Sequence, residues 1–421
     1  MSWFRLNEER MTVRMNERRQ TLIITVALVF ICSALSFYAG ASGLLPQVSQ
    51  RLGIVKSGAP AKLTAKPGVD LTQIERVQQY IQNQALETVP ARKLTEGALK
   101  GMVEATGDKY SAYFSPEAWA SFQQHFEPSF TGIGVHVETN AKTGLVTVVS
   151  PIKGSPGEQA GLKAGDAILS VDDKDITRMP LDQAVVLIKG PVGSKVRLTV
   201  RREGVSGDIR FSITRAIIDQ PTVESKMLEP GVGYIYVTEF NKQVTERVTK
   251  AIADLRGQDM TRLILDLRGN PGGLLDEAVG MASLFAPPKE PVLTVVYRNG
   301  EKQVYRSRAR ARWDLPLVVL VDGGSASASE ILAGAIKDLK LGTLMGVKTF
   351  GKGTVQSMYD LPNKDGIKLT TAKYLTAGGN SIHEKGIEPD VMVQNPQKVL
   401  PGEAGDVQLS EAQKYIKSLK R

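Results

Sequence analysis

Residues 317–335 read LVVLVDGGSASASEILAGA, in which five apolar residues run into a Gly-Gly turn and then into a helical pattern that begins near Ala328. The apolar run is typical of a strand buried on both faces, as in a parallel sheet covered by helices. Three serines, Ser325, Ser327 and Ser329, stand at the turn. A serine at such a junction has its hydroxyl in front of a helix N-terminus, with a neighbouring N–H group directed at the same point, as in a nucleophile elbow.

A second strand end has a similar composition. LDLRGNPGG, residues 265–273, leads from an apolar strand through a glycine-rich turn into a helix. Free N–H groups near a helix N-terminus suit a phosphate or an oxyanion. No Lys-Ser or Lys-Thr follows at the spacing of a phosphate-binding loop. Strands GYIYVTEF, RLILDLR, VLTVVY and PLVVLVD alternate with helical segments 244–254, 274–285 and 330–339, which predicts an α/β domain with largely parallel strands.

A serine nucleophile needs a base. His125, His136 and His383 are expected to be ordinary, because none has an Asp placed in the sequence to orient it. Lys352 is the alternative, since it lies between two glycines in TFGKGTVQ, residues 349–356. Burial there would lower the pKa of the amine and leave it able to take the serine proton, although a lone turn lysine is more often simply solvated.

Upstream, short alternating strands and glycine turns fill residues 130–218. TGIG at 131–134, AGLKAGDAILSVDD at 160–173 and an amphipathic stretch at 181–188 together resemble a PDZ domain. The resemblance implies that the N–H groups of Gly132, Ile133 and Gly134 hold a terminal carboxylate, while the strand from Val135 accepts a peptide by β-augmentation. A glycine-rich hairpin in a generic β domain is the alternative.

The N-terminus carries five arginines before residues 21–46, a run without any charge. A run of this length can span a bilayer, and its positive flank is expected to stay in the cytoplasm, so the rest of the chain would be exported. Ala39-Gly40-Ala41 leaves a cleaved signal peptide as the alternative to an uncleaved anchor. A buried core helix at this place is disfavoured, because it would be apolar on every face.

Composition restricts the partners. The net charge is +9, but 53 basic residues are spread among 44 acidic ones without a block of like charge, which disfavours a nucleic-acid partner. One cysteine, Cys32, excludes an internal disulfide and a cysteine zinc site, and three histidines disfavour a histidine metal site. Residues 408–421 predict a basic amphipathic helix.

Several ordered motifs resemble the carboxy-terminal processing peptidases of serine peptidase family S41. They are DKYSAYF at 108–114, the PDZ-like region, LDLRGNPGG, GSASASEILAGAIKD, FGKGTVQ and KGIEPDV at 385–391. The resemblance implies Ser327 as nucleophile, Lys352 as general base and Gln356 as the residue that holds the lysine. It places the oxyanion hole at the N–H groups of Ala328 and of Gly272 or Gly273, a choice that the sequence leaves open. Glu330 and Asp338 also match family positions, but acids at the two ends of a helix need no catalytic role.

The same resemblance implies a multidomain chain of α/β and β structure. Its expected parts are residues 1–20 in the cytoplasm, 21–45 as anchor or signal, 46–69 as linker, 70–127 as a helical domain, 128–218 as the PDZ domain, 219–395 as a crotonase-like peptidase domain and 396–421 as a tail helix.

The expected function is a serine endopeptidase that cleaves exported proteins recognised at a free C-terminus, at the periplasmic or extracytoplasmic face of a membrane. No metal or organic cofactor is implied, and the partners expected are protein substrates, a second copy of the chain and an activating adaptor protein. Lys189 stands where the family often has Arg at the end of the PDZ helix, and Lys lacks the bidentate contact that Arg makes. The rival hypotheses are a noncatalytic PDZ scaffold with a degraded peptidase domain, and acyl-CoA chemistry on a crotonase-like fold.

Overall fold

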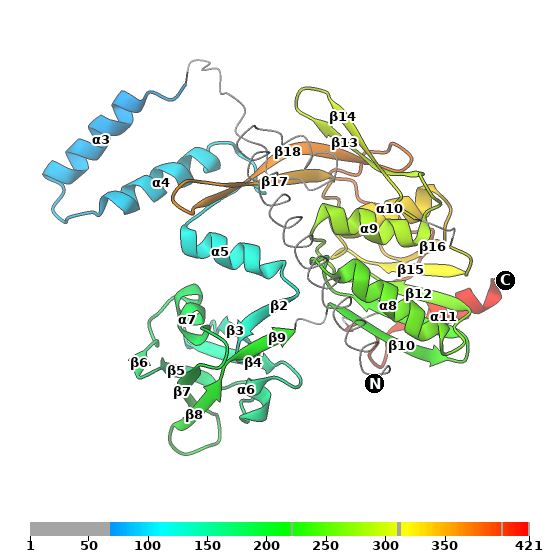
Figure 1. Cartoon of the computed structure of the whole chain (residues 1–421), viewed down its shortest axis with the longest axis horizontal. Coiled ribbons are helices and arrows are strands. Elements are labelled where there is room, and N and C mark those ends of the chain that lie inside the picture. Colours follow the sequence, from blue (N-terminus) through cyan, green and yellow to red (C-terminus); the bar gives the residue numbers. More distant parts are fainter. Residues whose placement is uncertain (1–67, 220–221, 310–312, 397–398, 420–421) are drawn as a thin grey trace, which may run out of the picture. The chain divides into compact units, whose positions relative to one another are not determined.

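The computed structural model describes residues 68–219, 222–309, 313–396 and 399–419 (Figure 1). The chain divides into two compact units, Met1–Thr88 and Val89–Arg421. The described part of the first unit is helix α3 (Leu71–Gln84), which Asp70 caps by accepting the N–H groups of Thr72 and Gln73. The membrane segment predicted at residues 21–45 lies outside the described residues. Within the described ranges, no helix is both long and apolar enough to cross a membrane.

The second unit contains a six-stranded sheet, which is parallel except at one edge. The apolar runs predicted as buried strands form its centre as β12 (Arg262–Asp266) and β15 (Leu317–Val321). The sheet order is β10 (Val223–Glu229), β11 (Val232–Val237), β12, β15, β16 (Thr343–Gly346) and β19 (Val391–Met392), with β10 and β11 antiparallel.

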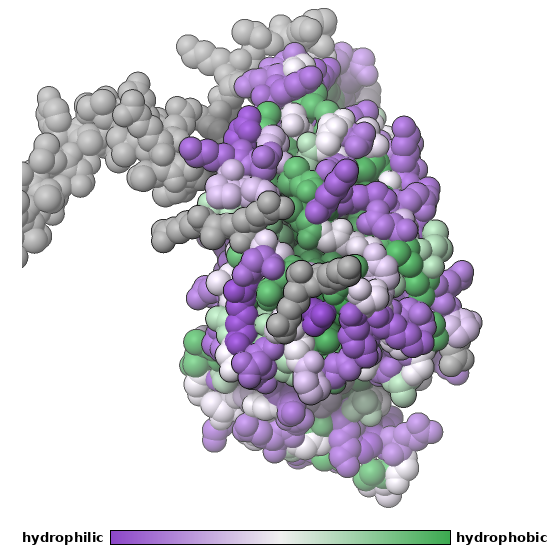
Figure 2. Space-filling model, turned by 90° about the vertical axis from the view of Figure 1, so that its right-hand side faces the viewer, coloured by the Kyte–Doolittle hydropathy of each residue, from purple (hydrophilic) through white to green (hydrophobic). Residues whose placement is uncertain are grey.

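Helices cover both faces of this sheet. Helices α8 (Val244–Arg256), α9 (Leu275–Phe285) and α10 (Ala328–Asp338) share one core with Leu263 and Leu265 of β12. The intervening Ile264 points to the other face and packs in the cluster that α11 (Val407–Ser418) completes. The segment predicted as a tail helix is therefore a packed layer of the domain. Hydrophilic residues cover most of the face in Figure 2, with smaller hydrophobic groups between them.

A second, antiparallel sheet was not expected from the sequence. VLTVVY forms a strand as predicted, β13 (Pro291–Tyr297), but the turn at Asn299-Gly300 returns the chain at once as β14 (Lys302–Arg306). Gly300 has φ +83°, which suits such a hairpin turn. The sheet continues through β18 (Gly366–Thr376) to β17 (Thr354–Asp360) and to β1 (Ala112–Phe114).

Strand β1 lies in the region predicted to be a helical domain, between α4 (Ala91–Glu104) and α5 (Pro116–His125). It pairs with β18, with Ala112 opposite Lys368. The buried Trp119 of α5 donates its Nε1–H to Asp360 Oδ1 at 2.7 Å. Residues 112–125 are therefore fastened to the β17–β18 hairpin.

The PDZ-like region has a core of its own. Its main sheet has the order β3 (Val135–Thr139), β4 (Val146–Pro151), β5 (Ala167–Val171), β7 (Lys195–Arg201) and β8 (Ile209–Thr214). Helix α7 (Leu181–Ile188) corresponds to the predicted amphipathic stretch. Strands β2 (Ser129–Gly132) and β9 (Ala216–Asp219), at the two ends of the region, pair with each other. Strand β3 stands at an edge, as peptide addition requires.

Candidate active site

Ser327 lies at the N-cap of α10, directly after the turn that ends β15. Its φ is +54° and its ψ −111°, a conformation that a non-glycine residue keeps only when its surroundings enforce it. The neighbouring serines provide such enforcement: Ser325 Oγ donates to Leu267 O at 2.8 Å, and Ser329 Oγ donates to Asn270 O at 2.9 Å. Both are fully buried, whereas Ser327 is partly exposed. The turn thus presents one serine at the surface of a strained strand-to-helix junction, as a nucleophile elbow does.

The two glycines of the second turn differ in what their N–H groups do. A Cβ on Gly272 would lie 2.8 Å from the nitrogen of Ala328, so the turn touches the start of α10. The Gly272 N–H, however, donates to Asn270 Oδ1 at 2.9 Å. Gly273 has φ +145°, and within the described ranges neither its N–H nor that of Ala328 has a hydrogen-bond acceptor. Gly273 and Ala328 are thus the two donors left for an oxyanion.

Glu330, in the first turn of α10, joins the serine turn to the lysine loop. Its buried carboxylate accepts four hydrogen bonds. Oε2 takes the backbone N–H groups of Ser327 and Lys352, each at 2.9 Å. Oε1 takes the N–H of Gly351 at 2.7 Å and the hydroxyl of Thr349 at 2.6 Å. The sequence indicated only a match to a family position and an acid at a helix end, although the spacing S-x-x-E is the signal of a capping box.

Lys352 is partly buried, with its Nζ 4.9 Å from the centre of the Tyr110 ring. Burial lowers the pKa of its ammonium, and repulsion by Lys368 lowers it further. Asp108 and Glu330 act in the opposite direction without reversing the shift. A lysine in this environment is biased toward the neutral amine that a general base requires.

Gln356 lies near Lys352 but makes different contacts from those expected. Its Nε2 donates to Thr354 Oγ1 at 3.0 Å and to Thr370 Oγ1 at 3.2 Å. No hydrogen bond joins Gln356 to Lys352 among the described residues. Because its amide nitrogen is fixed by the two threonines, its carbonyl oxygen is the atom available to a lysine.

One cavity of about 290 Å³ brings these groups together. Six residues predicted from the sequence line it: Ser327, Lys352, Gln356, Ala328, Gly272 and Gly273. The rest of the lining is Phe122, His125, Phe126, Glu239, Pro271, Leu274, Leu275, Ile331, Thr354, Val355, Met358, Lys368 and Tyr374. Most of these are apolar or aromatic, as in a site that binds a peptide side chain next to the reacting groups.

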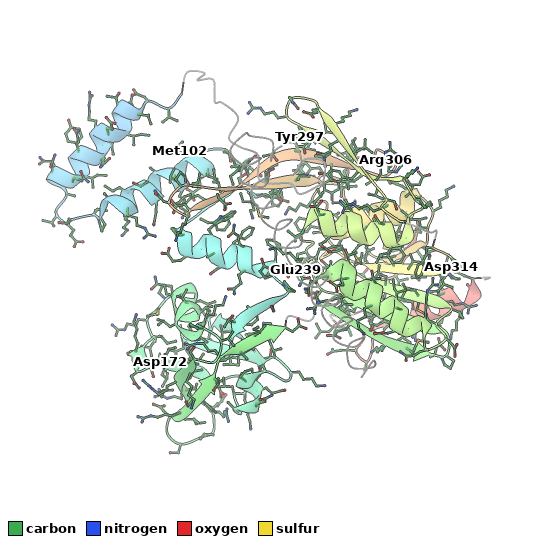
Figure 3. All side chains as sticks on the ribbon, viewed as in Figure 1. Met102, Asp172, Glu239, Tyr297, Arg306 and Asp314 are labelled. Carbon is green, nitrogen blue, oxygen red and sulfur yellow. The ribbon has the colours of Figure 1, made fainter. Side chains whose placement is uncertain are left out.

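His125 also lines this cavity, which its sequence context did not indicate. Its Nε2 lies 2.7 Å from Glu239 Oε1, and this hydrogen bond raises the pKa of the imidazole although burial opposes it. Glu239, labelled in Figure 3, follows β11 and is more than 100 residues away in the chain, so no local motif could reveal the pair. His136 is exposed on β3. His383 lies against the lysine loop, because a Cβ on Gly353 would lie 2.7 Å from the backbone nitrogen of His383.

The end of β12 is held by buried charges. Arg268 forms two hydrogen bonds of 2.7 Å with the carboxylate of Asp406, which caps α11, and it also pairs with Asp266. The hydroxyl of Tyr234 donates to Asp266 at 2.8 Å. The C-terminal layer is therefore tied to the strand from which the glycine turn departs. The motif LDLR contained two of these residues, but their partner lies 138 positions further on.

The predicted peptide-binding loop of the PDZ-like region has a firm backbone. Ile133 is buried in the core of this region, so its side chain is not part of an open pocket. Gly134 has φ +73°, and a Cβ there would lie 2.3 Å from Cβ of Ser155, so no larger residue fits. The carbonyl of Ile133 accepts the N–H of Gly157 at 2.7 Å.

Lys189, at the C-terminal end of α7, reaches α5. Its Nζ donates to Gln124 Oε1 at 2.7 Å and lies 5.8 Å from the centre of the Phe130 ring. Burial lowers the pKa of its ammonium. Together with Val135 and His136 it lines a separate cavity of about 220 Å³ beside the edge strand β3. In the described part of the chain, no three metal-ligating side chains gather into a possible metal site.

Comparison with known proteins identifies three regions. Residues 231–393 match the model of peptidase family S41, residues 147–202 match a PDZ domain, and residues 30–118 match the N-terminal domain of the activating protease CtpB. The first two matches fall on the α/β and PDZ-like regions described above.

The matches to similar proteins cover most of the chain. The carboxy-terminal processing protease CtpA of Bacillus subtilis is 38% identical over 90% of this chain and 78% of its own length. CtpB of the same organism is 36% identical over 94% of this chain and 81% of its own. A carboxyl-terminal-processing protease of Synechocystis is 37% identical over 72% of both. The sequence resemblance is thus confirmed, and the chain belongs to the carboxy-terminal processing proteases of serine peptidase family S41.

Proposed function

We propose that the chain is a serine endopeptidase in which Ser327 is the nucleophile and Lys352 the general base. The observation that supports this most directly is the position of Glu330. One of its carboxylate oxygens holds the backbone of both residues, and the two side chains line the same cavity. A nucleophile and base fixed to a common buried group meet the requirement for preorganised geometry.

The reaction begins when Ser327 Oγ attacks the carbonyl carbon of the scissile bond and its proton passes to the neutral Nζ of Lys352. The carbonyl oxygen becomes an oxyanion, which the N–H groups of Gly273 and Ala328 stabilise. The C–N bond then breaks, and the lysine gives the proton to the leaving amine. Water attacks the acyl-enzyme in the same way, which releases the new carboxylate and restores Ser327.

Of the two glycines that the sequence left open, we assign Gly273 as the oxyanion donor. The N–H of Gly272 is already engaged by Asn270, whereas that of Gly273 has no acceptor within the described ranges. Gly272 serves a different purpose, because a side chain there would collide with the start of α10.

Mass spectrometry of the trapped intermediate tests the proposal. An unstructured peptide with an apolar free C-terminus is incubated with the protein and quenched in acid. We expect an acyl group on the proteolytic fragment that contains Ser327. Ser325→Ala should still be acylated, because that hydroxyl points into the core, whereas Ser327→Ala should not be. Acylation of Ser327→Ala at another residue would refute the assignment.

The substrate is proposed to be a protein recognised at its free C-terminus. The loop Gly132, Ile133 and Gly134 and the edge strand from Val135 have the form that a β-augmenting peptide needs. Lys189 would supply a cation beside them, in competition with its present contact to Gln124.

The location is proposed from the sequence. Arginines followed by the uncharged residues 21–46 support export, with residues 21–45 either kept as an anchor or removed after Ala41. The peptidase would then work at the extracytoplasmic face of the membrane. Assembly with a second copy, and control by an adaptor protein, are further parts of the proposal that rest on the family resemblance.

A further inference from the structure

The catalytic cavity contains a second lysine, Lys368, that the reaction above does not use. It lies on β18, opposite Ala112 of β1 and Met358 of β17. Its Nζ lies 5.2 Å from the centre of the Phe122 ring and 5.9 Å from that of Phe114. Among the described residues it forms no ion pair.

The aromatic rings of the cavity favour the charged form more at Lys368 than at Lys352. Two aromatic rings face its ammonium, against one ring for Lys352, and ring faces attract cations. Pairing on both sides of β18 fixes the backbone of Lys368, whereas Lys352 lies in a loop between two glycines. The geometry therefore keeps a positive charge in the cavity that contains the candidate base.

We propose that Lys368 is a positioning residue that acts through its charge, by disfavouring a second ammonium at Lys352 and so keeping the base neutral. Two like charges in a poorly solvated cavity cannot both be carried without cost, so one lysine releases its proton first. The better-stabilised cation, Lys368, stays protonated, and Lys352 becomes the amine. This inference rests on the proposed role of Lys352.

Other charged groups also act on the two lysines. Burial lowers the pKa of both lysines, and Lys368 lowers that of Lys352 further. Asp108 opposes the shift at both sites, and Glu330 opposes it at Lys352.

Three further titratable groups line the same cavity. His125 and Glu239 are paired with each other, and the hydroxyl of Tyr374 donates to the carbonyl of Ser327. Tyr110 meets Lys352 through its ring face. Removal of Lys368 and removal of Asp108 should therefore shift the pKa of Lys352 in opposite directions.

The test uses a fluorophosphonate and the full-length protein. Ser327 Oγ attacks phosphorus, fluoride leaves, and the serine proton passes to Lys352, so the labelling rate follows the neutral fraction of the lysine without involving the PDZ-like region. Rates are measured from pH 6 to 10. For Lys368→Met we expect the rate at pH 7 to fall by roughly threefold to tenfold, with the high-pH plateau within about twofold of wild type.

Matched variants separate charge from packing. Lys368→Arg keeps the charge and should keep the wild-type profile. Lys373→Met removes a positive charge from an exposed position on the same strand and should change nothing. Asp108→Asn should move the profile in the opposite direction, with faster labelling at low pH. This variant also tests the inference if Lys368→Met does not fold.

The results distinguish this inference from the proposed dyad. An unshifted profile in Lys368→Met, or an equal fall at every pH, would overturn the role of Lys368 while leaving the dyad intact, provided that Lys352→Arg is not labelled. Labelling of Lys352→Arg at the wild-type rate would overturn the dyad, and the role of Lys368 with it.

Discussion

The backbone N–H groups of Ser327 and Lys352 donate to the same atom, Oε2 of Glu330, each at 2.9 Å. The two residues are 25 positions apart and lie on different elements, so this shared acceptor sets their relative position. The other oxygen of Glu330 fixes the loop that carries the lysine through Gly351 and Thr349. A carboxylate accepts about four hydrogen bonds, so the donors around Glu330 use all of its acceptor positions.

Glu330→Gln should reduce kcat/KM by about a hundredfold, because a small displacement of nucleophile and base is costly. The amide offers one oxygen, and its NH₂ group would face two N–H donors where the second oxygen accepted their hydrogen bonds. The measurement is peptide cleavage, with the unfolding transition as a check on folding. Glu388→Gln is the control, since Glu388 is exposed and pairs with Lys348. Equal activity of both variants would show that Glu330 does not position the dyad.

Asp406→Ala should lower the free energy of unfolding by about 3 kcal/mol, near the lower end for breaking a buried ion pair, because Asp266 still pairs with Arg268. Unfolding in urea measures this loss of free energy. Glu411→Ala, which removes an exposed pair with Lys414 on the same helix, should change it by less than about 1 kcal/mol. Similar losses in the two variants would contradict a structural role for the buried pair.

The stabilisation that the pair of Asp406 and Arg268 provides also depends on pH. Burial opposes the charge of Asp406, but Arg268 and two backbone N–H groups outweigh it and hold the pKa below its usual range. A depressed carboxyl pKa stabilises the fold above the ordinary Asp pKa of about 4, and this stabilisation is lost as the pH falls further. The difference in the free energy of unfolding between wild type and Asp406→Ala should therefore become smaller at acid pH.

Much of the catalytic domain could be predicted from local patterns. The apolar runs at β12 and β15 and the glycine turns after them identify buried parallel strands and the helices that follow. Those same turns contain Ser327, Gly272 and Gly273, so the position of the site at the strand ends could also be predicted. The antiparallel sheet could not be predicted in this way. The strand VLTVVY pairs with β14 through a hairpin turn and with β18, which lies some 80 residues later.

The parts of the site that could not be predicted depend on distant partners. Asp406 meets Arg268 across 138 positions, and His125 meets Glu239 across the whole PDZ-like region. The pairing of β1 with β18 brings Tyr110 and Asp108 near the lysine, although their region shows only helical periodicity. Sequence spacing has no information on such pairings unless a known family provides it.

A substrate with a free C-terminal carboxylate should be cleaved faster than the same peptide with an amidated end. At the proposed site, loop N–H groups and Lys189 would form charge-assisted hydrogen bonds with a carboxylate, and an amide offers no full negative charge. Comparison of kcat and KM for the two peptides measures the effect. A change in KM alone would indicate tethering, and a change in kcat would indicate that binding also controls the dyad. Equal kcat/KM values would show that the terminus is not recognised.

Expressed at full length in a bacterium with its own N-terminus, the protein should sediment with membranes, and protease added to spheroplasts should digest the chain beyond residue 45. The uncharged run at residues 21–46 is long enough to span a bilayer core. Release in soluble form with an N-terminus at Ser42 would indicate cleavage. Complete protection in intact spheroplasts would contradict export.

The pH dependence of kcat/KM, measured with wild type, Lys352→Arg and Ser327→Ala, tests the central claim most directly. Burial and the nearby Lys368 lower the pKa of Lys352, so the neutral amine is favoured and the wild-type rate should rise with pH along that titration. Lys352→Arg keeps a positive charge that cannot be removed, so its kcat/KM should fall by about 10³-fold or more. The kcat/KM of Ser327→Ala should fall by a similar factor. A Lys352→Arg protein that cleaves at the wild-type rate with the wild-type profile would contradict the dyad.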